Sequence, residues 1–150
     1  MSKNLQEIPR YKNCFVCGSA NVSGLKTHFI TDQKQVFCDV IFQPEHVGYR
    51  NRIHGGVISG VLDEAMGWVC YVHSNNFYYT VELTVSYLKP VSPRESFQVL
   101  ASLDKLKRGF GFTVAVLLDI HGDVVAKASG KFCEVHPDDY EDIYSILDTD

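Results

Sequence analysis

One segment, from Val57 to His73, decides much of what this chain can fold into. It is apolar on nearly all sides, and its only strongly polar residues before its end are Ser59, Asp63 and Glu64. A helix that is hydrophobic all round is buried inside a fold. We therefore predict one long central helix that the rest of the chain surrounds.

The segments on both sides of this helix alternate with the period of two that is typical of β-strands. Two short stretches between Leu25 and Phe42 indicate a hairpin. After the helix, four more segments alternate: 77–91, 97–106, 110–120 and 124–135. The alternation in the first of these predicts that one face carries its polar residues, Thr80, Glu82, Thr84 and Ser86. This order predicts the α+β class, with an antiparallel sheet curled around a single helix.

The two ends of the chain lack this strong patterning. Residues 1–24 show no clear period, so we expect an irregular lead-in. Residues 137–150 carry apolar positions at helical spacing among many acids, which predicts a short acidic helix. A length of 150 residues fits one domain, and we expect 1–150 to be that domain.

Charge and hydropathy argue against several classes of protein. The net charge of −4 comes from the acidic end, and the remainder is near neutral, unlike the basic surface of a nucleic-acid-binding protein. No apolar run approaches the roughly 18 residues of a membrane span. The start, MSKNLQEIPRYKN, lacks the apolar core of a signal peptide. We therefore expect a cytoplasmic protein that binds neither nucleic acid nor membrane.

The cysteines predict free thiols rather than a disulfide framework, because there are five of them, scattered through a chain without an export signal. Cys14 and Cys17 form half of a zinc-knuckle pattern. No second Cys-x-x-Cys or His-x-x-x-His pair completes a tetrahedral site. We therefore predict no metal.

His54-Gly55-Gly56 stands where the central helix begins. The unpaired N–H groups and the dipole of a helix start favour negative charge, and glycines let a ligand approach the backbone. Such a site suits the oxyanion that forms when a thioester carbonyl is attacked. The alternative interpretation is a glycine-rich helix start with a capping histidine.

Asp63 and Glu64 interrupt the apolar helix. An inward-facing carboxylate costs several kcal/mol unless it is paired or functional, so we expect at least one of them to face a site. Asp63 lies nine residues after His54, about two and a half turns, and is predicted to share a pocket wall with the helix start. Glu64 is rotated by about 100° and is either a rival of Asp63 or a structural partner.

The segment HVGYRNRIHGGVISGVLDEAMGW (46–68) resembles the HGG loop and central helix of hotdog-fold thioesterases related to the phenylacetyl-CoA type. The similarity extends to TVELTVSYLKPV (80–91) and to CFVCGSANVSGL (14–25). The resemblance implies a hotdog fold and hydrolysis of acyl-CoA to free acid and CoA. It implies no separate cofactor, because CoA is part of the substrate.

The resemblance also implies roles for individual residues. The amide of Gly55 would bind the thioester oxygen, and Asp63 would act as base or nucleophile. His54 would shape the loop. A hydroxyl from the partner subunit's long strand orients the attacking water in several relatives, and Thr80 occupies the matching place.

Substrate contacts are expected near the helix start and at strand ends. Gly56 belongs to the HGG loop, and Asn51 lies near the position at which many relatives have an asparagine and this chain has Gly48. The phosphates of CoA require positive charge, for which Lys89 and Arg108 are candidates. The acyl group is left open, because pocket depth depends on the packing of Trp68, Tyr71, Phe77 and Tyr78.

Two other functions fit the same pattern. One is a non-catalytic acyl-CoA sensor, and the other is a hotdog hydratase or dehydratase. In each case a sheet around one helix leaves edge strands to pair, and relatives place the active site between subunits. We therefore expect a homodimer or a dimer of dimers, a homotetramer.

Overall fold

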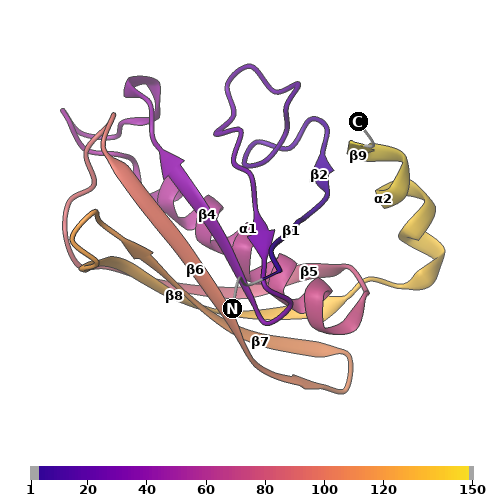
Figure 1. Cartoon of the computed structure of the whole chain (residues 1–150). Coiled ribbons are helices and arrows are strands. Elements are labelled where there is room, and N and C mark those ends of the chain that lie inside the picture. Colours follow the sequence, from indigo (N-terminus) through magenta and orange to yellow (C-terminus); the bar gives the residue numbers. More distant parts are fainter. Residues whose placement is uncertain (1–3, 149–150) are drawn as a thin grey trace.

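One antiparallel sheet wraps around one long helix in the computed structural model, which describes residues 4–148 (Figure 1). Helix α1 spans Gly55–Ser74. The sheet has seven strands in the order β1-β3-β4-β6-β7-β8-β5. The predicted α+β class, with an antiparallel sheet curled around a single helix, is therefore confirmed.

The strands and short helices have the following bounds. The strands are β1 Gln6–Glu7, β2 Arg10–Tyr11, β3 Ile30–Thr31, β4 Gln35–Ile41, β5 Tyr78–Tyr87, β6 Ser96–Lys107, β7 Phe110–Leu118, β8 Val124–Glu134 and β9 Leu147–Asp148. The remaining helices are η1 Pro44–His46, η2 Pro137–Asp139 and α2 Tyr140–Ile146. The hairpin expected from the sequence is β3–β4, while the lead-in contains β1 and β2.

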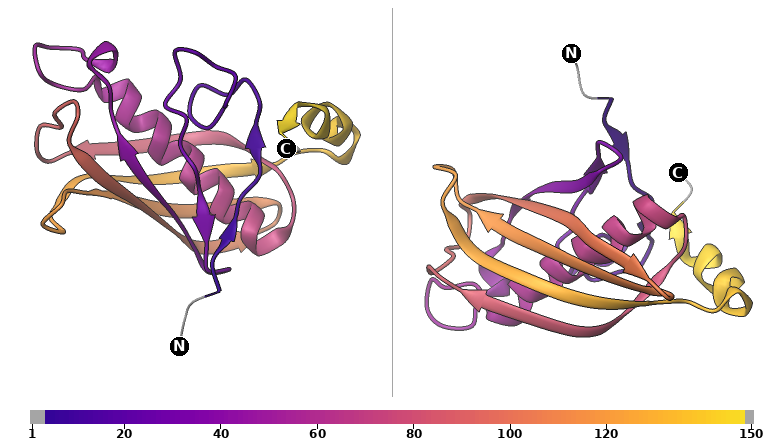
Figure 2. Two further views of the ribbon diagram at one scale, coloured as in Figure 1. Left: turned by 45° about the horizontal axis from the view of Figure 1, so that its top comes forward. Right: turned by 90° about the horizontal axis from the view of Figure 1, so that it is seen from below.

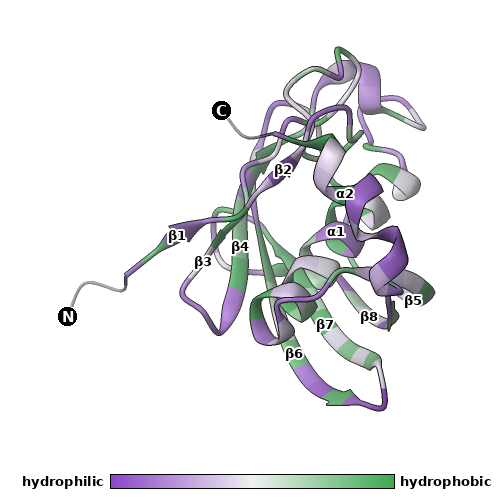
Figure 3. Cartoon of the chain, turned by 90° about the vertical axis from the view of Figure 1, so that its right-hand side faces the viewer, coloured by the Kyte–Doolittle hydropathy of each residue, from purple (hydrophilic) through white to green (hydrophobic). Residues whose placement is uncertain are grey.

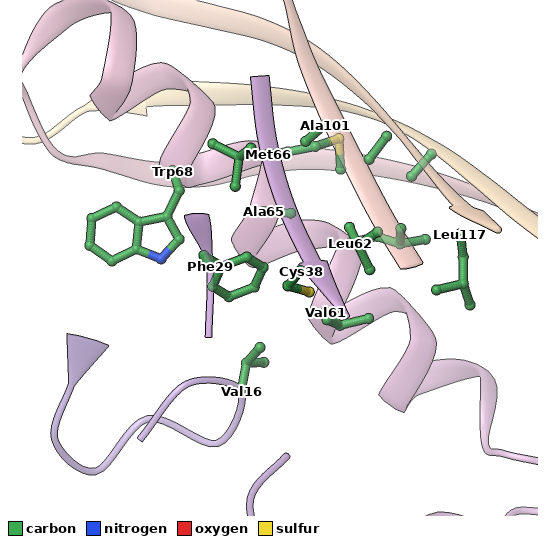
Figure 4. Close-up of a cluster of buried hydrophobic side chains, with 14 of the residues drawn as sticks. Val16, Phe29, Cys38, Val61, Leu62, Ala65, Met66, Trp68, Ala101 and Leu117 are labelled. Atoms are coloured by element: carbon green, nitrogen blue, oxygen red, sulfur yellow. The ribbon is translucent and has the colours of Figure 1, made fainter. Parts of the chain in front are cut away.

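The core lies between α1 and the inner face of the sheet. Leu62 and Met66 of α1 are fully buried and point toward Ala101 of β6 and Leu117 of β7 (Figure 4). Hydrophobic residues also run along β4 and β7 beside the helix (Figure 3). The apolar character of α1 on nearly all sides is thus explained, because the helix is covered by the sheet on one side and by other segments elsewhere.

Local capping sets both ends of α1. The Nδ1 atom of His54 accepts a hydrogen bond from the Gly56 amide, and Asn75 ends the helix in the left-handed conformation with φ 61°. The helix therefore begins two residues before the predicted start at Val57. Within residues 4–148, no helix is both long and apolar enough to cross a membrane.

A β-bulge in β5 changes which side chains face the helix. The register with β8 shifts between Thr80, opposite Phe132, and Glu82, opposite Lys131. Phe132 is buried, so Thr80 lies on the inner face, whereas Glu82 lies on the outer face with Lys131. The prediction that Thr80 shares a face with the following polar residues is wrong, because one extra residue reverses the alternation.

The N-terminal segment covers the side of α1 that lies away from β7 and β8 (Figure 2). Tyr11 stacks on Trp68 of the helix with ring centroids 5.1 Å apart. Val16 packs against the helix at Gly60. Strand β2 pairs with β9, so the end of the described chain lies beside this segment.

Candidate active site

Asp63 projects from α1 toward the inward-facing hydroxyl of β5. The Oγ1 atom of Thr80 donates a hydrogen bond of 2.7 Å to Oδ1 of Asp63. Both residues belong to the same chain, although the resemblance implied a hydroxyl from a partner subunit. The bulge in β5 causes this contact, because it turns Thr80 toward the helix.

The carboxylate of Asp63 lines a cavity of about 260 Å³. The cavity lies beside the middle and the second half of α1. Its lining includes Gly60 and Gly67, which have no side chain. Aromatic residues make up much of the remaining wall: Tyr11, Trp68, Tyr71, Phe77, Tyr78 and Phe132. A carboxylate in such a wall can act on a polar group that an apolar ligand carries into the cavity.

The surroundings of Asp63 keep its proton affinity above that of an exposed aspartate. Partial burial raises the pKa of the Asp63 carboxyl, and the hydrogen bond from Thr80 opposes this rise. Burial favours the neutral form, whereas a donated hydrogen bond favours the charged form. A carboxylate with a raised pKa is a stronger base than an ordinary aspartate, which suits general base catalysis.

The start of α1 offers one free backbone donor. The Gly56 amide is occupied by the ring of His54 at 2.8 Å. For the Gly55 amide, no acceptor is found in the described part of the chain. The carbonyl of Gly55 is held by the hydroxyl groups of Ser59 and Tyr87, at 2.9 and 2.8 Å. A fixed, unpaired amide at a helix N-terminus is suited to bind an anion.

The helix start and Asp63 belong to different cavities. Gly55 lines a second cavity of about 390 Å³ together with Arg52, Tyr87 and Lys89. Because Gly55 and Asp63 are eight residues apart in α1, about 12 Å of helix axis separates them. The prediction that Asp63 shares a pocket wall with the helix start is therefore wrong for a single chain.

Glu64 faces a different neighbourhood from Asp63. Its Oε1 atom accepts hydrogen bonds from the thiols of Cys14 and Cys17, at 3.0 and 3.4 Å. Its Oε2 atom is buried and has no partner among residues 4–148. Burial raises the pKa of the Glu64 carboxyl well above its usual range. Glu64 also lines the cavity of Asp63, beside Cys14.

The other predicted substrate contacts are dispersed. Asn51 lies in the loop before the helix with φ 57°, a conformation that asparagine tolerates well, and it lines neither of the two cavities. Lys89 lines the Gly55 cavity and pairs with Asp123 at 3.2 Å. Arg108 lies in the β6–β7 turn.

Lys89 and Arg108 are at opposite ends of the sheet. Tyr87 is opposite Ala126 in β8, and Phe110 is opposite Cys133, a separation of about 23 Å along the strand. In a single chain they therefore cannot hold the same phosphate group. Arg52, which our sequence analysis missed, is the basic residue that joins Lys89 in the Gly55 cavity. The signal for Arg52 was its position two residues before His54.

A larger apolar cavity of about 460 Å³ adjoins that of Asp63. It shares Tyr11, Cys14, Phe77 and Tyr78 with the Asp63 cavity and extends beneath Ile143 and Ile146 of the C-terminal region. Tyr71, Phe77, Tyr140 and Tyr144 form a chain of ring contacts beside it. Together the two cavities can accommodate an apolar group larger than acetyl.

Comparison with known proteins defines the class of this chain. Residues 51–126 match the family model of the thioesterase superfamily, and this chain belongs to that superfamily. The matched region contains the helix start, Asp63 and Thr80. The match therefore includes the residues that form the candidate site.

One relative is similar to this chain over part of its length. An uncharacterized protein of Schizosaccharomyces pombe is 30% identical over 102 residues, which cover 63% of this chain and 58% of that protein. This chain thus spans little more than half the length of that relative.

Solved structures support the fold. A thioesterase superfamily protein superposes with a TM-score of 0.74 at 20% identity, covering 81% of this chain and 60% of that protein. The PaaI protein of the Escherichia coli phenylacetic acid degradation operon gives a TM-score of 0.69 at 16% identity, covering 75% of this chain and 81% of PaaI. A Streptococcus mutans protein bound to acetyl CoA gives 0.65 at 15% identity, covering 90% and 91%. The predicted hotdog fold and the resemblance to hotdog-fold thioesterases are confirmed.

Proposed function

We propose that this protein hydrolyses acyl-CoA thioesters to a carboxylic acid and free CoA. The observation that carries the proposal is the half-buried Asp63 carboxylate, oriented by Thr80 in the wall of an aromatic cavity. Membership of the thioesterase superfamily supports the reaction class. The acyl group would enter the aromatic cavity, which brings its carbonyl carbon toward Asp63.

In the proposed reaction, Asp63 accepts a proton from a water molecule as that water attacks the thioester carbonyl carbon. The carbonyl oxygen becomes an oxyanion, which accepts a hydrogen bond from the Gly55 amide. The intermediate then collapses, the C–S bond breaks, and the CoA thiolate leaves and takes up a proton. In the second possible route, Asp63 itself attacks and forms an anhydride that water opens.

A single turnover in oxygen-18-labelled water tests for the nucleophilic route. If Asp63 is the base, the label appears in the product acid and is absent from the protein. If Asp63 is the nucleophile and water opens the anhydride at the aspartyl carbon, the label is incorporated into the Asp63 carboxylate. Label found by mass spectrometry in the peptide that contains Asp63 therefore establishes the nucleophilic route, whereas label in the product acid alone is compatible with either route.

We further propose that two copies of the chain complete each site. A thioester carbonyl must lie about 3 Å from both its base-activated water and its oxyanion donor, whereas about 12 Å of helix axis separates Gly55 from Asp63. Strand β5 is an edge of the sheet, and its side chains Tyr79 and Val81 are more than half exposed. A long exposed edge strand is a surface for pairing with another strand. In such a dimer, Gly55 would act with Asp63 of the partner subunit.

The cavity at Gly55 would then receive the CoA moiety. Arg52 and Lys89 line it and supply positive charge for the phosphates. The S. mutans structure with bound acetyl CoA supports a ligand of this type for the fold. Arg52→Ala is expected to raise KM for acyl-CoA while leaving hydrolysis of a truncated acyl thioester unchanged.

A panel of acyl-CoAs with a thiol reagent tests the reaction. Wild-type protein should release CoA from at least one aromatic or medium-chain substrate, and Asp63→Asn should not. Tight binding without release by the wild type would favour the acyl-CoA sensor. Hydration of an enoyl-CoA without CoA release would favour the hydratase. Either outcome overturns the proposal.

The role of Gly55 can be tested with a matched pair of variants. Gly55→Pro removes the amide donor at the first position of α1, where proline is compatible with a helix. Gly55→Ala keeps the amide but adds the same Cβ, which lies 3.1 Å from the Tyr87 ring. We expect Gly55→Pro to lose about 10²–10³-fold more kcat than Gly55→Ala. Equal losses would exclude the amide as the oxyanion donor.

The shared site is tested by mixing two inactive variants. Gly55→Pro and Asp63→Asn chains, denatured together and refolded at equal amounts, form mixed dimers in about half of the molecules. Each mixed dimer has one intact site of two, so about a quarter of wild-type activity should return. No recovery, with mixed dimers verified by native mass spectrometry, would place the site within one chain.

A further inference from the structure

Three metal-ligating atoms from distant parts of the chain converge beside α1. They are the Sγ atoms of Cys14 and Cys17 and a carboxylate oxygen of Glu64, and all lie within 4.8 Å of one another. Oε1 of Glu64 is 3.0 Å from the Cys14 sulfur and 3.4 Å from the Cys17 sulfur. The sequence offered only the cysteine pair, and the fold adds a third donor.

The spacing of these atoms suits a tetrahedral metal ion. Zinc binds sulfur at about 2.3 Å and carboxylate oxygen at about 2.0–2.2 Å, so two sulfurs and one oxygen in a tetrahedral site lie about 3.5–3.8 Å apart. The distance from Glu64 Oε1 to the Cys17 sulfur, 3.4 Å, is close to this range, and the distance to the Cys14 sulfur, 3.0 Å, is about 0.5 Å shorter. Thiolate ligands also select zinc over magnesium or calcium, which prefer oxygen alone.

The turn that carries the two cysteines is shaped to present their sulfurs. The Gly18 amide donates to the Cys14 carbonyl at 2.9 Å, and a Cβ at Gly18 would lie only 2.5 Å from the Cys14 backbone. The amides of Val16 and Tyr11 donate to the sulfurs of Cys14 and Cys17, both at 3.3 Å. Backbone N–H groups aimed at sulfur favour the thiolate form, which is the form that binds metal.

Within residues 4–148, no Lys, Arg or His side chain bonds to any of the three acidic groups of the cluster. Arg10 donates to the carbonyl of Cys17 and contacts His28, rather than any of the three donor atoms. Oε2 of Glu64 is buried, and within residues 4–148 it has no hydrogen-bond partner. A buried, unpartnered carboxylate oxygen is costly, and a bound cation would remove that cost.

We propose that Cys14, Cys17 and Glu64 bind one zinc ion. Its fourth position opens toward the cavity of Asp63, because Cys14 and Glu64 both line that cavity. Binding releases the protons of the thiols and of the carboxyl group. The ion joins the N-terminal turn to α1 and thereby fixes one wall of the cavity. This proposal does not rest on the proposed hydrolysis.

Metal analysis of untagged protein tests the site. Protein from zinc-supplemented cells, gel-filtered to remove loosely bound ions, should contain about one zinc per chain by mass spectrometry. Cys17→Ser and Glu64→Gln should each lose it. Cys133→Ser removes a thiol outside the cluster, and Asp63→Asn removes the adjacent carboxylate. Both variants should retain the zinc. Because zinc content is measured without an activity assay, the test stays valid if the protein does not hydrolyse acyl-CoA.

Cobalt provides a measurement that does not depend on a variant folding. Cobalt(II) added to metal-free wild-type protein should produce a near-ultraviolet sulfur-to-cobalt charge-transfer band that saturates at about one equivalent, with the intense visible bands of tetrahedral coordination. Zinc should displace it. Wild-type protein that carries no zinc and shows no charge-transfer band with cobalt overturns the proposal.

Discussion

Asp63 and Glu64 are neighbours in the sequence and line the same cavity, yet α1 presents them to different hydrogen-bond partners. Asp63 faces β5 and has one hydroxyl partner, Thr80. Glu64 faces the N-terminal turn and has two thiol partners. Burial raises the pKa of both carboxyls, but the hydrogen bond to Asp63 lowers its pKa, whereas the charge of Cys14 raises that of Glu64 further. One helical step of about 100° thus separates a carboxylate suited to proton transfer from one suited to ligation.

The largest expected loss of activity comes from replacing the Asp63 carboxylate by an amide, and the same change at Glu64 is the comparison. Asp63→Asn should lower kcat for acyl-CoA hydrolysis by about 10²–10⁴-fold, because it removes the proposed base. Glu64→Gln leaves the Thr80–Asp63 contact in place and should cost less than about tenfold. Steady-state kinetics on both variants, with circular dichroism to verify folding, measures the difference. Equal losses would show that the two carboxylates are not specialised.

A smaller loss of activity is expected from removing the Thr80 hydroxyl, which bonds to Asp63 and not to Glu64. Thr80→Val removes the hydrogen bond that lowers the Asp63 pKa, so this pKa should rise further. The base works only when deprotonated, so the acidic limb of the kcat/KM profile should move to higher pH. At neutral pH the loss should be about ten- to a hundredfold.

Thr80→Ser is the control for this change, because it keeps the hydroxyl. Its pH profile should coincide with that of the wild type. A Thr80→Val profile that falls uniformly at every pH, with no shift of its acidic limb, would contradict the assigned effect on Asp63.

The smallest expected effect comes from enlarging Gly67, which lines the cavity of Asp63. Gly67→Ala adds a methyl group 3.6 Å from the Phe132 ring, an ordinary contact, so the fold should tolerate it. Alanine also favours a helix over glycine by up to about 1 kcal/mol, so thermal stability should rise. The smaller cavity should raise KM for bulky acyl-CoAs by up to about tenfold and leave acetyl-CoA unaffected. Unchanged KM values would show that the acyl group does not bind beside Gly67.

The sequence was sufficient to predict the parts of this molecule that depend on local pattern. The all-round apolar segment predicted the central helix, and period-two alternation predicted every strand of the seven-stranded sheet except β1. All four aromatic residues expected around the pocket, Trp68, Tyr71, Phe77 and Tyr78, line the cavity of Asp63. Patterns of this kind are visible because each is repeated over neighbouring residues.

The remaining features depend on contacts that no local pattern contains. Cys14 and Cys17 precede Glu64 by 50 and 47 residues, so no spacing rule connects them. The bulge that turns Thr80 inward leaves no mark in the alternation of β5, because Val81 is as compatible with a strand as its neighbours. Arg52 could be joined to Lys89 only once the fold had brought the two loops to one cavity.

The pairing of β2 with β9 determines when the cysteine turn can reach its final form. Arg10 pairs with Asp148, and the Lys12 amide donates to the Ile146 carbonyl at 2.8 Å. Ser19, just beyond the cysteines, bonds to Asp148 across 129 residues of sequence. Contacts of such high sequence separation form late in folding, because a long loop must close first. During synthesis, the cysteine turn therefore emerges well before residues 146–148 and is fixed in place only after they have been made.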